Sequence, residues 1–182
     1  MDFQKPNLPN SHGVMRAVRE TIHTLLMVIA IYTLVNLAIP RYAVEGRSMQ
    51  PSFNGEGDER VIVNRLEYLL RDPERGDIIV LNNPNGTDHY IKRIVGLPGE
   101  KLSMRNGFVL INGDSLAEPY LRPGYRGRES GDWARIASES YFVLGDNRTM
   151  SCDSRRWGVV PRDAIIGQAE VTYWPPNRIG EP

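Results

Sequence analysis

Three segments of the chain concentrate side chains that can take part in chemical reactions. The first, residues 45–53 (EGRSMQPSF), places Ser48 in a turn-prone context between a glycine and a proline, where its hydroxyl can be exposed. The second, residues 90–100 (YIKRIVGLPGE), carries Lys92 inside an apolar, β-branched run. The third, residues 145–158 (GDNRTMSCDSRRWG), is dense in hydrogen-bonding groups. Serine and lysine form a known catalytic pair, because a neutral lysine can take the proton of a serine hydroxyl.

Lys92 needs a lowered pKa to act as such a base. A reference lysine titrates at about 10.4, so at neutral pH only about one in a few thousand is uncharged. Lowering the pKa to about 8 requires roughly 3 kcal/mol of destabilisation of the ammonium form. Side chains alternate along a strand, so Lys92 and Arg93 face opposite sides and one of them must point toward the buried side. Burial would lower the lysine pKa; the alternative is a solvated lysine that protects a sheet edge.

Each segment also has an ordinary structural explanation when it is taken singly. Ser48 can be a loop serine, and residues 145–158 can be a polar turn held by Asx and serine hydrogen bonds. His89 suggests a Ser-His-Asp triad, but it precedes Lys92 by three positions and is expected on the opposite strand face, as a surface histidine. Cys152 is expected to be a filler within its segment rather than a reactive thiol.

A long apolar segment lies near the N-terminus. No Asp, Glu, Lys or Arg occurs between Glu20 and Arg41, and most of the intervening residues are apolar. As a helix this run spans roughly 27–30 Å, about one hydrocarbon core, and Pro40 ends it. We expect a transmembrane signal anchor at residues 22–40 after a short tail at 1–21. A buried soluble helix would show a polar face, and a cleavable signal peptide would show an Ala-x-Ala-like site after the run.

Composition places the rest of the chain among β-rich globular domains. The 182 residues suffice for one domain of ordinary size, and the 17 Gly and 13 Pro favour a turn-rich β fold. The 22 basic and 22 acidic residues balance, which disfavours bulk binding to nucleic acid. One cysteine excludes an intramolecular disulfide and a cysteine-based zinc cluster. The acidic residues at 58–59 and 72–77 are expected to be solvated loop charges rather than metal ligands.

The segment after the anchor, residues 41–182, predicts one mainly β domain. Asn106-Gly107 predicts a two-residue hairpin turn. Residues 67–70 and 161–164 predict short helical turns, and residues 122–138 are expected to leave the sheet. Runs rich in Val, Ile and aromatic residues predict strands at 61–64, 77–82, 90–95, 101–105, 108–112, 141–144 and 165–173.

Together, in this order and after an anchor, the three segments resemble those of the bacterial type I signal peptidases. This leader peptidase family comprises membrane-bound serine proteases that use a Ser-Lys dyad. Residues 48–51 (SMQP) match the family's nucleophile box. Residues 92–100 (KRIVGLPGE) are similar to its lysine box almost residue for residue, and residues 145–155 (GDNRTMSCDSR) are similar to its third box. The resemblance covers the chain from the anchor to about Trp174.

The resemblance implies a role for each matching residue. Ser48 would be the nucleophile, Lys92 the general base, and Ser151 would bond the Lys92 amine and orient it. Gly46 stands where some family members carry a serine that helps to hold the oxyanion, so backbone N–H groups, that of Ser48 first, would do so here. Met49 and Phe53 are expected to be walls of the substrate pocket. Supporting roles are implied for Asp146, for Arg93 beside the base, and for an ion pair of Asp153 and Arg155.

The family also implies a fold, a location and a substrate class. The fold would be a coiled antiparallel β-sheet catalytic domain with one N-terminal transmembrane helix, without cofactor or metal. The protein would be a single-pass cell-membrane protein, with a cytoplasmic N-terminus and an extracytoplasmic domain; the flanking charges are too balanced to decide this. Its partners would be the lipid bilayer and preproteins, cleaved at small-x-small sites, with no nucleic acid. Residues 173–176 (YWPP) and Phe53 are expected either at the bilayer interface or packed within the domain.

Three other hypotheses remain open. The chain can be a specialised relative that processes one dedicated substrate, such as a pilus precursor in conjugation. It can be a non-catalytic, membrane-tethered β module, which the joint presence of Ser48, Lys92 and Ser151 argues against. It can be related to the soluble self-cleaving repressor proteases that use the same pair, which the anchor and the absence of a DNA-binding helical domain disfavour.

Overall fold

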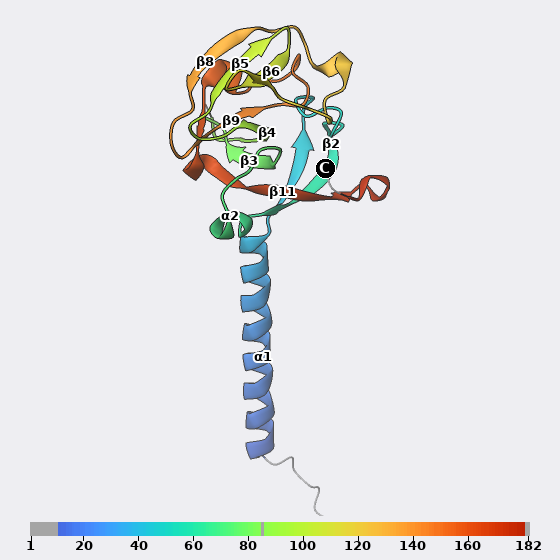
Figure 1. Cartoon of the computed structure of the whole chain (residues 1–182). Helices are drawn as coiled ribbons and strands as arrows, with labels where there is room; N and C mark the ends of the chain where they lie inside the picture. Colours follow the sequence, from blue (N-terminus) through green and yellow to red (C-terminus); the bar gives the residue numbers. More distant parts are fainter. Residues whose placement is uncertain (1–10, 85, 181–182) are drawn as a thin grey trace, which may run out of the picture. The chain divides into compact units, whose positions relative to one another are not determined.

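The computed structural model describes residues 11–84 and 86–180 (Figure 1). Its contacts divide the chain into two units, one that ends at Ala38 and one that begins at Ile39. The first unit contains one helix, α1 (Ser11–Ala38), of 28 residues, which corresponds to a length of about 42 Å. Within it, Gly13–Ala38 is long and apolar enough to cross a membrane. The helix thus begins before the anchor expected at residues 22–40, and residues 1–10 of the expected tail lie outside the described residues.

Polar side chains inside the apolar part of α1 bond to the helix itself. The Thr24 hydroxyl donates to the carbonyl oxygen of Glu20 at 2.9 Å, and the Thr33 hydroxyl donates to that of Ile29 at 2.8 Å. The Asn36 amide donates to the carbonyl oxygen of Tyr32 at 2.8 Å. Because a polar group in hydrocarbon needs an internal partner, these bonds make the few polar residues compatible with an apolar surrounding.

The second unit is built from two antiparallel sheets, as the mainly β fold class predicts (Figure 1). The order of the seven-stranded sheet is β1-β2-β11-β3-β4-β9-β10, and that of the four-stranded sheet is β7-β6-β5-β8. The larger sheet contains β1 (Arg41–Glu45), β2 (Glu56–Asn64), β3 (Ile78–Asn82), β4 (His89–Gly96), β9 (Ser140–Leu144), β10 (Val160–Pro161) and β11 (Ile165–Trp174). The smaller sheet contains β5 (Lys101–Arg105), β6 (Phe108–Ile111), β7 (Asp114–Ser115) and β8 (Gly131–Arg135).

Helices in this domain are short. They comprise α2 (Glu67–Leu70), α3 (Ser154–Trp157) and three 3₁₀ turns. The turns are η1 (Pro123–Tyr125), η2 (Arg162–Ala164) and η3 (Pro176–Arg178). The helical turns expected at 67–70 and 161–164 are therefore confirmed within one residue.

The predicted hairpin is confirmed, whereas the expected excursion is wrong. Arg105 pairs with Phe108 across Asn106 and Gly107, whose φ values of 50° and 81° are the left-handed pair that a type I′ turn requires. Within the expected excursion at 122–138, β8 pairs with β5. Its sequence, GDWAR, lacks an apolar run because it forms a sheet edge with exposed polar side chains.

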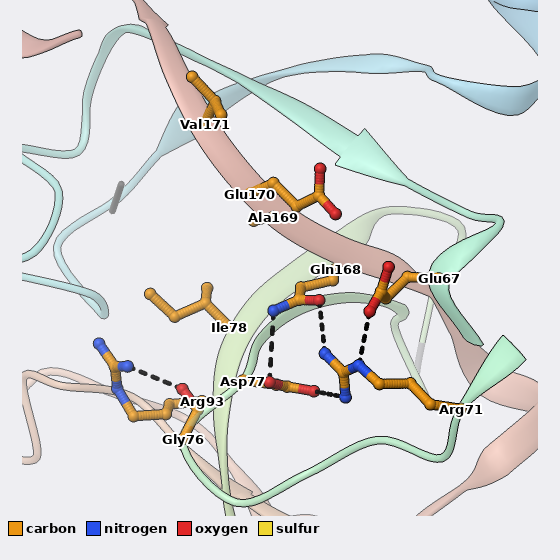
Figure 2. A pocket seen from close by; sticks show the side chains of 10 residues that line it. All are labelled: Glu67, Arg71, Gly76, Asp77, Ile78, Arg93, Gln168, Ala169, Glu170 and Val171. Carbon is orange, nitrogen blue, oxygen red and sulfur yellow. Dashed lines mark hydrogen bonds and ion pairs between the residues drawn. The ribbon is translucent and has the colours of Figure 1, made fainter. Parts of the chain in front are cut away.

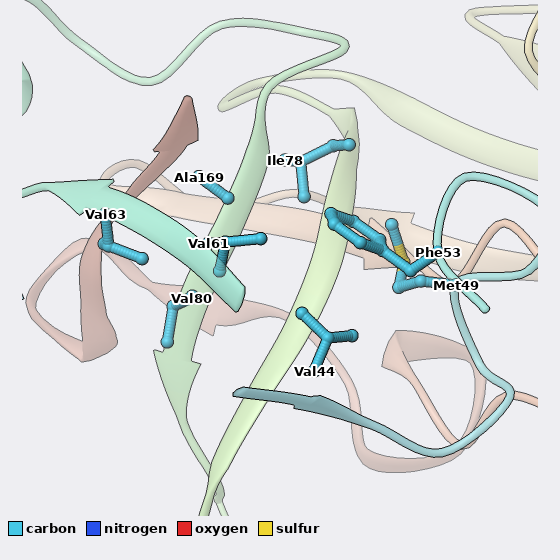
Figure 3. Close-up of a cluster of buried hydrophobic side chains, with 8 residues drawn as sticks. All are labelled: Val44, Met49, Phe53, Val61, Val63, Ile78, Val80 and Ala169. Atoms are coloured by element: carbon cyan, nitrogen blue, oxygen red, sulfur yellow. The ribbon is translucent and has the colours of Figure 1, made fainter. Parts of the chain in front are cut away.

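Buried side chains form three hydrophobic clusters. One of them, drawn in Figure 3, joins β1, β2, β3 and β11 to the loop between β1 and β2. The loop contributes Met49 and Phe53, which are almost fully buried. This cluster therefore anchors the loop that carries Ser48. It consists of Val44, Met49, Phe53, Val61, Val63, Ile78, Val80 and Ala169.

Two of the acidic residues expected to be solvated are instead held by the fold. Glu59 is fully buried and accepts a hydrogen bond from Arg178 Nε at 2.9 Å. Asp77 accepts from the Tyr68 hydroxyl and from Arg71 Nη1, both at 2.9 Å. Arg178 lies 119 positions from Glu59, so no local pattern could mark this pair. Tyr68 and Arg71 lie only 9 and 6 positions before Asp77, but their contact with it depends on how the chain turns between α2 and β3.

Candidate active site

The loop that carries Ser48 is closed at its neck by two glycines. The amide of Gly46 donates to the carbonyl oxygen of Gly55 at 2.9 Å. A Cβ atom on Gly55 would lie 1.8 Å from the carbonyl oxygen of Gly46, so only glycine fits at this crossing. With Met49 and Phe53 buried beneath it, the loop holds Ser48 in a defined position.

Ser48 and Lys92 are in direct contact. Lys92 Nζ lies 2.9 Å from Ser48 Oγ and 2.8 Å from the carbonyl oxygen of Ile91. Lys92 comes from β4 and is only 3% exposed. Its Nζ also lies 5.2 Å from the centre of the Tyr90 ring. The two residues that the sequence singled out, 44 positions apart, thus meet with the geometry of a nucleophile and a base.

Burial changes the chemistry of Lys92. Desolvation lowers the pKa of its ammonium group from 10.5 to about 8, against smaller opposing contributions from Asp153, Cys152 and Asp146. The amine is therefore accessible close to neutral pH. The expectation that one of Lys92 and Arg93 points toward the buried side is met by Lys92, and Arg93 is buried as well, at only 8% exposed. Both faces of β4 are covered at this point, and the buried guanidinium of Arg93 has a carboxylate partner.

That partner is Asp146, which joins three segments. Arg93 donates to Asp146 through Nε at 2.9 Å and through Nη2 at 2.7 Å, a bidentate pair. The Ser52 hydroxyl donates to the same carboxylate at 2.6 Å. Asp146 of the third segment thus holds together β4, which carries Lys92, and the loop that carries Ser48. Ser52 was not among the expected site residues, although its hydroxyl so close to Ser48 was a usable signal.

Asp153 and Arg155 form the ion pair that the resemblance implied. Arg155 Nε lies 2.8 Å from Asp153 Oδ1, and Nη2 lies 2.9 Å from Oδ2. Asp153 also caps α3 by accepting from the Arg155 amide and accepts from the amide of Gly145 at 3.0 Å. The pair therefore fixes the turn between β9 and α3.

Ser151 lies close to Ser48 but does not make the expected bond. It is 7% exposed, and its hydroxyl has no hydrogen-bond partner among the described residues. A Cβ atom on Gly145 would lie 2.3 Å from Ser151 Oγ and 2.4 Å from the carbonyl oxygen of Ser48. Both groups thus pack against Gly145. Lys92 directs its hydrogen bonds to Ser48 and to the carbonyl of Ile91 instead.

A groove runs past Ser48 between β1 and β4. Its cavity has a volume of about 310 Å³. Met49 and Phe53, expected as its walls, do not line it; they lie in the core below it, where they pack with the valines that do. β1, which the sequence analysis missed, supplies the opposite wall. The lining residues are Tyr42, Ala43, Val44, Glu45, Ser48, Val61, Val80, Asp88, His89, Tyr90, Ile91 and Lys92.

His89 lies in the same groove, where the strand alternation did not place it. It is exposed and packs edge-on against Tyr42, with ring centres 5.4 Å apart. It is the first residue of β4 and pairs in register with Asn82. The groove is lined by consecutive residues of β4, from His89 to Lys92, so a position on the opposite face from Lys92 does not exclude His89 from it. His89 makes no hydrogen bond to Ser48 among the described contacts, so it does not complete a triad.

A second cavity, of about 550 Å³, is polar but internally satisfied (Figure 2). Arg71 donates to Glu67 at 2.6 Å, to Asp77 at 2.9 Å and to Gln168 at 2.8 Å. Arg93 reaches this cavity only to donate to the carbonyl oxygen of Gly76 at 2.8 Å. Glu170 accepts from Asn64, at 2.8 Å, outside the lining. The polar side chains of this cavity thus have partners in the fold, and they present no nucleophile beside a base.

Comparison with known proteins identifies the family of this chain. Residues 17–174 match the family model described as "Signal peptidase, peptidase S26". A signal peptidase I of Leptolyngbya laminosa is 40% identical over 180 residues, which cover 92% of this chain and 83% of that protein. A signal peptidase I of Bacillus caldolyticus is 38% identical over 160 residues, which cover 81% of this chain and 86% of that protein.

A solved structure is similar as well. The crystal structure of a signal peptidase I from Enterococcus faecalis shares 32% sequence identity, with a TM-score of 0.49 over 54% of this chain and 97% of that chain. The matches to the family model and to the relatives define the class of the protein as a hydrolase of the serine endopeptidase type. Within that class, the chain belongs to the signal peptidase family, peptidase S26.

Proposed function

We propose that this signal peptidase cuts its substrates with a dyad in which Ser48 is the nucleophile and Lys92 the general base. The observation that carries this proposal is the 2.9 Å contact between Lys92 Nζ and Ser48 Oγ at a lysine that burial holds at a pKa of about 8. A serine hydroxyl is a weak nucleophile until a neighbouring base takes its proton. The neutral amine of Lys92 is the group placed to take it.

The reaction then follows in two steps. The Ser48 Oγ atom attacks the scissile carbonyl carbon while its proton passes to the Lys92 amine. The resulting ammonium gives this proton to the leaving amide nitrogen as the C–N bond breaks, which leaves an ester on Ser48. Water attacks the ester and gives a proton to Lys92, and the proton returns to Ser48 Oγ. The carboxylic acid product leaves, and the neutral amine is restored.

Backbone N–H groups would stabilise the oxyanion of this reaction. Gly46 has no side chain that could donate a hydrogen bond. The Ser48 amide has no acceptor in the part of the chain that the structure describes. A free N–H on the nucleophile itself is a recurrent oxyanion donor. Ser151, Asp146 and the ion pair of Asp153 with Arg155 would act by shaping the site rather than by touching the reacting atoms.

The groove between β1 and β4 suits an extended peptide with small side chains. Its walls are two strands, against which an extended segment can bind through its backbone. Ala43 and the nearly buried Val44, Val61 and Val80 contribute small apolar side chains to it. Glu45, Asp88 and His89 line it with polar side chains. These features support cleavage of signal-peptide-bearing preproteins at small-x-small sites.

The apolar helix supports attachment to the cell membrane. We assign the anchor to residues 22–40 within α1 and its following turn, a cytoplasmic tail to residues 1–21, and an extracytoplasmic peptidase domain to residues 41–182. This arrangement brings the groove to the side on which exported preproteins emerge. The length and apolar character of Gly13–Ala38 support the span.

The test is cleavage of a preprotein with an Ala-x-Ala site by the detergent-solubilised full chain, measured across pH. The wild type should cleave at that site, with a rate that rises as pH increases through about 8 and Lys92 loses its proton. Ser48→Ala and Lys92→Ala should each abolish cleavage. The matched controls are Ser138→Ala and Lys101→Ala, which remove exposed side chains that do not line the groove.

The outcomes separate the hypotheses. Activity that survives in Lys92→Ala would contradict the dyad and would direct attention to His89. No cleavage of the preprotein by folded wild type would favour a relative dedicated to one substrate, or a non-catalytic module. Cleavage at a different site with both variants inactive would keep the dyad and reject the small-x-small specificity.

A further inference from the structure

A third cavity, of about 340 Å³, lies between the loop after η1 and the segment that follows β9. It shares no lining residue with the groove between β1 and β4. Its lining is rich in arginine, whereas that groove is lined by no arginine. The side chains that give it this character are Arg128, Arg148, Arg155 and Arg156, and the hydroxyls of Thr149 and Ser151 also line it.

We call this cavity the basic pocket. One of its lining residues lies next to the loop of the nucleophile. Ser151 is part of its lining, and Ser151 Oγ and the Ser48 carbonyl oxygen press against the same glycine, Gly145. The Ser48 carbonyl also accepts from the amide of Asn147, at 2.9 Å, in the same segment. A residue of an extended chain spans about 3.3 Å. A peptide whose scissile bond lies at Ser48 therefore reaches the pocket with its nearest residues.

The pocket carries an excess of positive charge. Arg148 pairs with buried Glu118, and Arg155 pairs with Asp153 at 2.8 Å and with exposed Glu129 at 2.5 Å. Glu129 also lines the pocket, and its negative charge would repel an anion that enters.

Two further arginines are unopposed. Arg128 and Arg156 are exposed, and neither has an ion-pair partner among the described residues. Both guanidinium groups remain available to a ligand at the pocket.

Two donors of the lining also lack partners. Arg148 is 3% exposed, and its Nη1 atom has no hydrogen-bond acceptor within the described part of the chain. The buried hydroxyl of Ser151 has no partner there either. A buried donor without an acceptor is unfavourable, so an acceptor oxygen that enters the pocket would gain free energy at both.

We propose that the basic pocket binds a carboxylate side chain of the substrate on the leaving side of the scissile bond, in the first residues of the mature chain. This inference rests on the proposed function. The groove between β1 and β4, with its small apolar side chains, is assigned to the small residues before the cleavage site, which leaves the pocket for the residues after it. The enzyme would thus prefer preproteins with Asp or Glu shortly after the cleavage site.

The experiment compares preproteins that are identical except for Asp or Asn at the second position of the mature chain. The detergent-solubilised full chain should show a kcat/KM about 5-fold higher for the Asp substrate, the size expected for a carboxylate beside partly exposed guanidinium groups. In Arg128→Gln/Arg156→Gln the Asp-to-Asn ratio should fall to about one. Arg41→Gln/Arg65→Gln removes the same charge from exposed positions outside the pocket and should keep the wild-type ratio.

The ratio of kcat/KM for the two substrates tests the inference separately from the proposed function. Equal kcat/KM for both substrates in the wild type would overturn the inference while leaving the proposed function intact. Failure to cleave either substrate would instead reject the proposed function. A ratio that falls equally in both double variants would mean that overall charge, and not the pocket, selects the substrate. Inorganic phosphate at constant ionic strength should reduce the ratio in the wild type only, if the same pocket takes free anions.

Discussion

At the scale of the residue, the burial of Lys92 that would make it a base also lowers the stability of the fold. Its folded pKa of about 8 lies below its ordinary value of 10.5, so between these values the unfolded chain binds more protons and stability rises with pH. Below pH 8 the buried ammonium costs about 3 kcal/mol. Lys92→Met should therefore raise the free energy of unfolding at pH 7 by up to about 3 kcal/mol. The gain should shrink as the pH approaches 10, as measured by thermal unfolding followed with near-UV circular dichroism.

The control for this prediction is Lys101→Met, which alters an exposed lysine on β5. It should show no pH-dependent gain in Tm. If Lys92→Met is less stable than the wild type at every pH, the bonds to Ser48 and Ile91 outweigh desolvation, and the pKa of the lysine is not lowered.

His89 provides a second test at this scale, because it shares the groove with the dyad. Since it makes no described hydrogen bond to Ser48, His89→Ala should keep kcat within about 3-fold of the wild type, whereas the loss of a general base costs at least about 100-fold. Its contact with Tyr42 predicts that any effect falls on KM. Steady-state kinetics with the Ala-x-Ala preprotein measure both constants, and a loss of kcat comparable to that of Lys92→Ala would contradict the assignment of the base.

At the scale of the element, the turn after β9 sets the distance between the third segment and the nucleophile loop. A Cβ atom on Gly145 would lie 2.4 Å from the backbone carbonyl of Ser48, so Gly145→Ala must displace one of the two segments. A displacement of about 1 Å at a catalytic group costs about 100-fold in rate. We expect kcat/KM to fall by about that factor, with the fold retained by circular dichroism. The control is Gly124→Ala, where a Cβ atom meets nothing within 4 Å and kcat/KM should not change. Equal kcat/KM in the two variants would contradict the close packing of Gly145 against the Ser48 carbonyl.

At the scale of the whole molecule, α1 is expected to hold the enzyme in the bilayer. A central Arg disfavours insertion of a helix by about 2.5–3.5 kcal/mol, so Ile29→Arg/Thr33→Arg should release much of the protein from membranes washed with alkaline carbonate. Phe108→Arg/Val159→Arg adds the same charge at exposed positions of the β domain and should stay in the pellet. Retention of both variants would show that α1 is not the membrane anchor.

Local sequence patterns determined several parts of this protein. The apolar run up to Ala38, the Asn106-Gly107 turn and the β-branched strands each follow from interactions between residues close in the chain, which is why they could be predicted. The residues of the candidate dyad, Ser48 and Lys92, were also marked by the sequence through their local surroundings and by resemblance.

Only the tertiary structure decided which side chains are covered. Strand alternation tells on which face Lys92 and Arg93 lie, but burial of both depends on segments far away in the chain, such as the one that brings Asp146 to Arg93. In the same way Met49 became core rather than groove wall, and Ser151 came to lie against Gly145 without its expected bond. The physical reason is that desolvation and hydrogen bonding between distant segments are set by packing, which no local pattern contains.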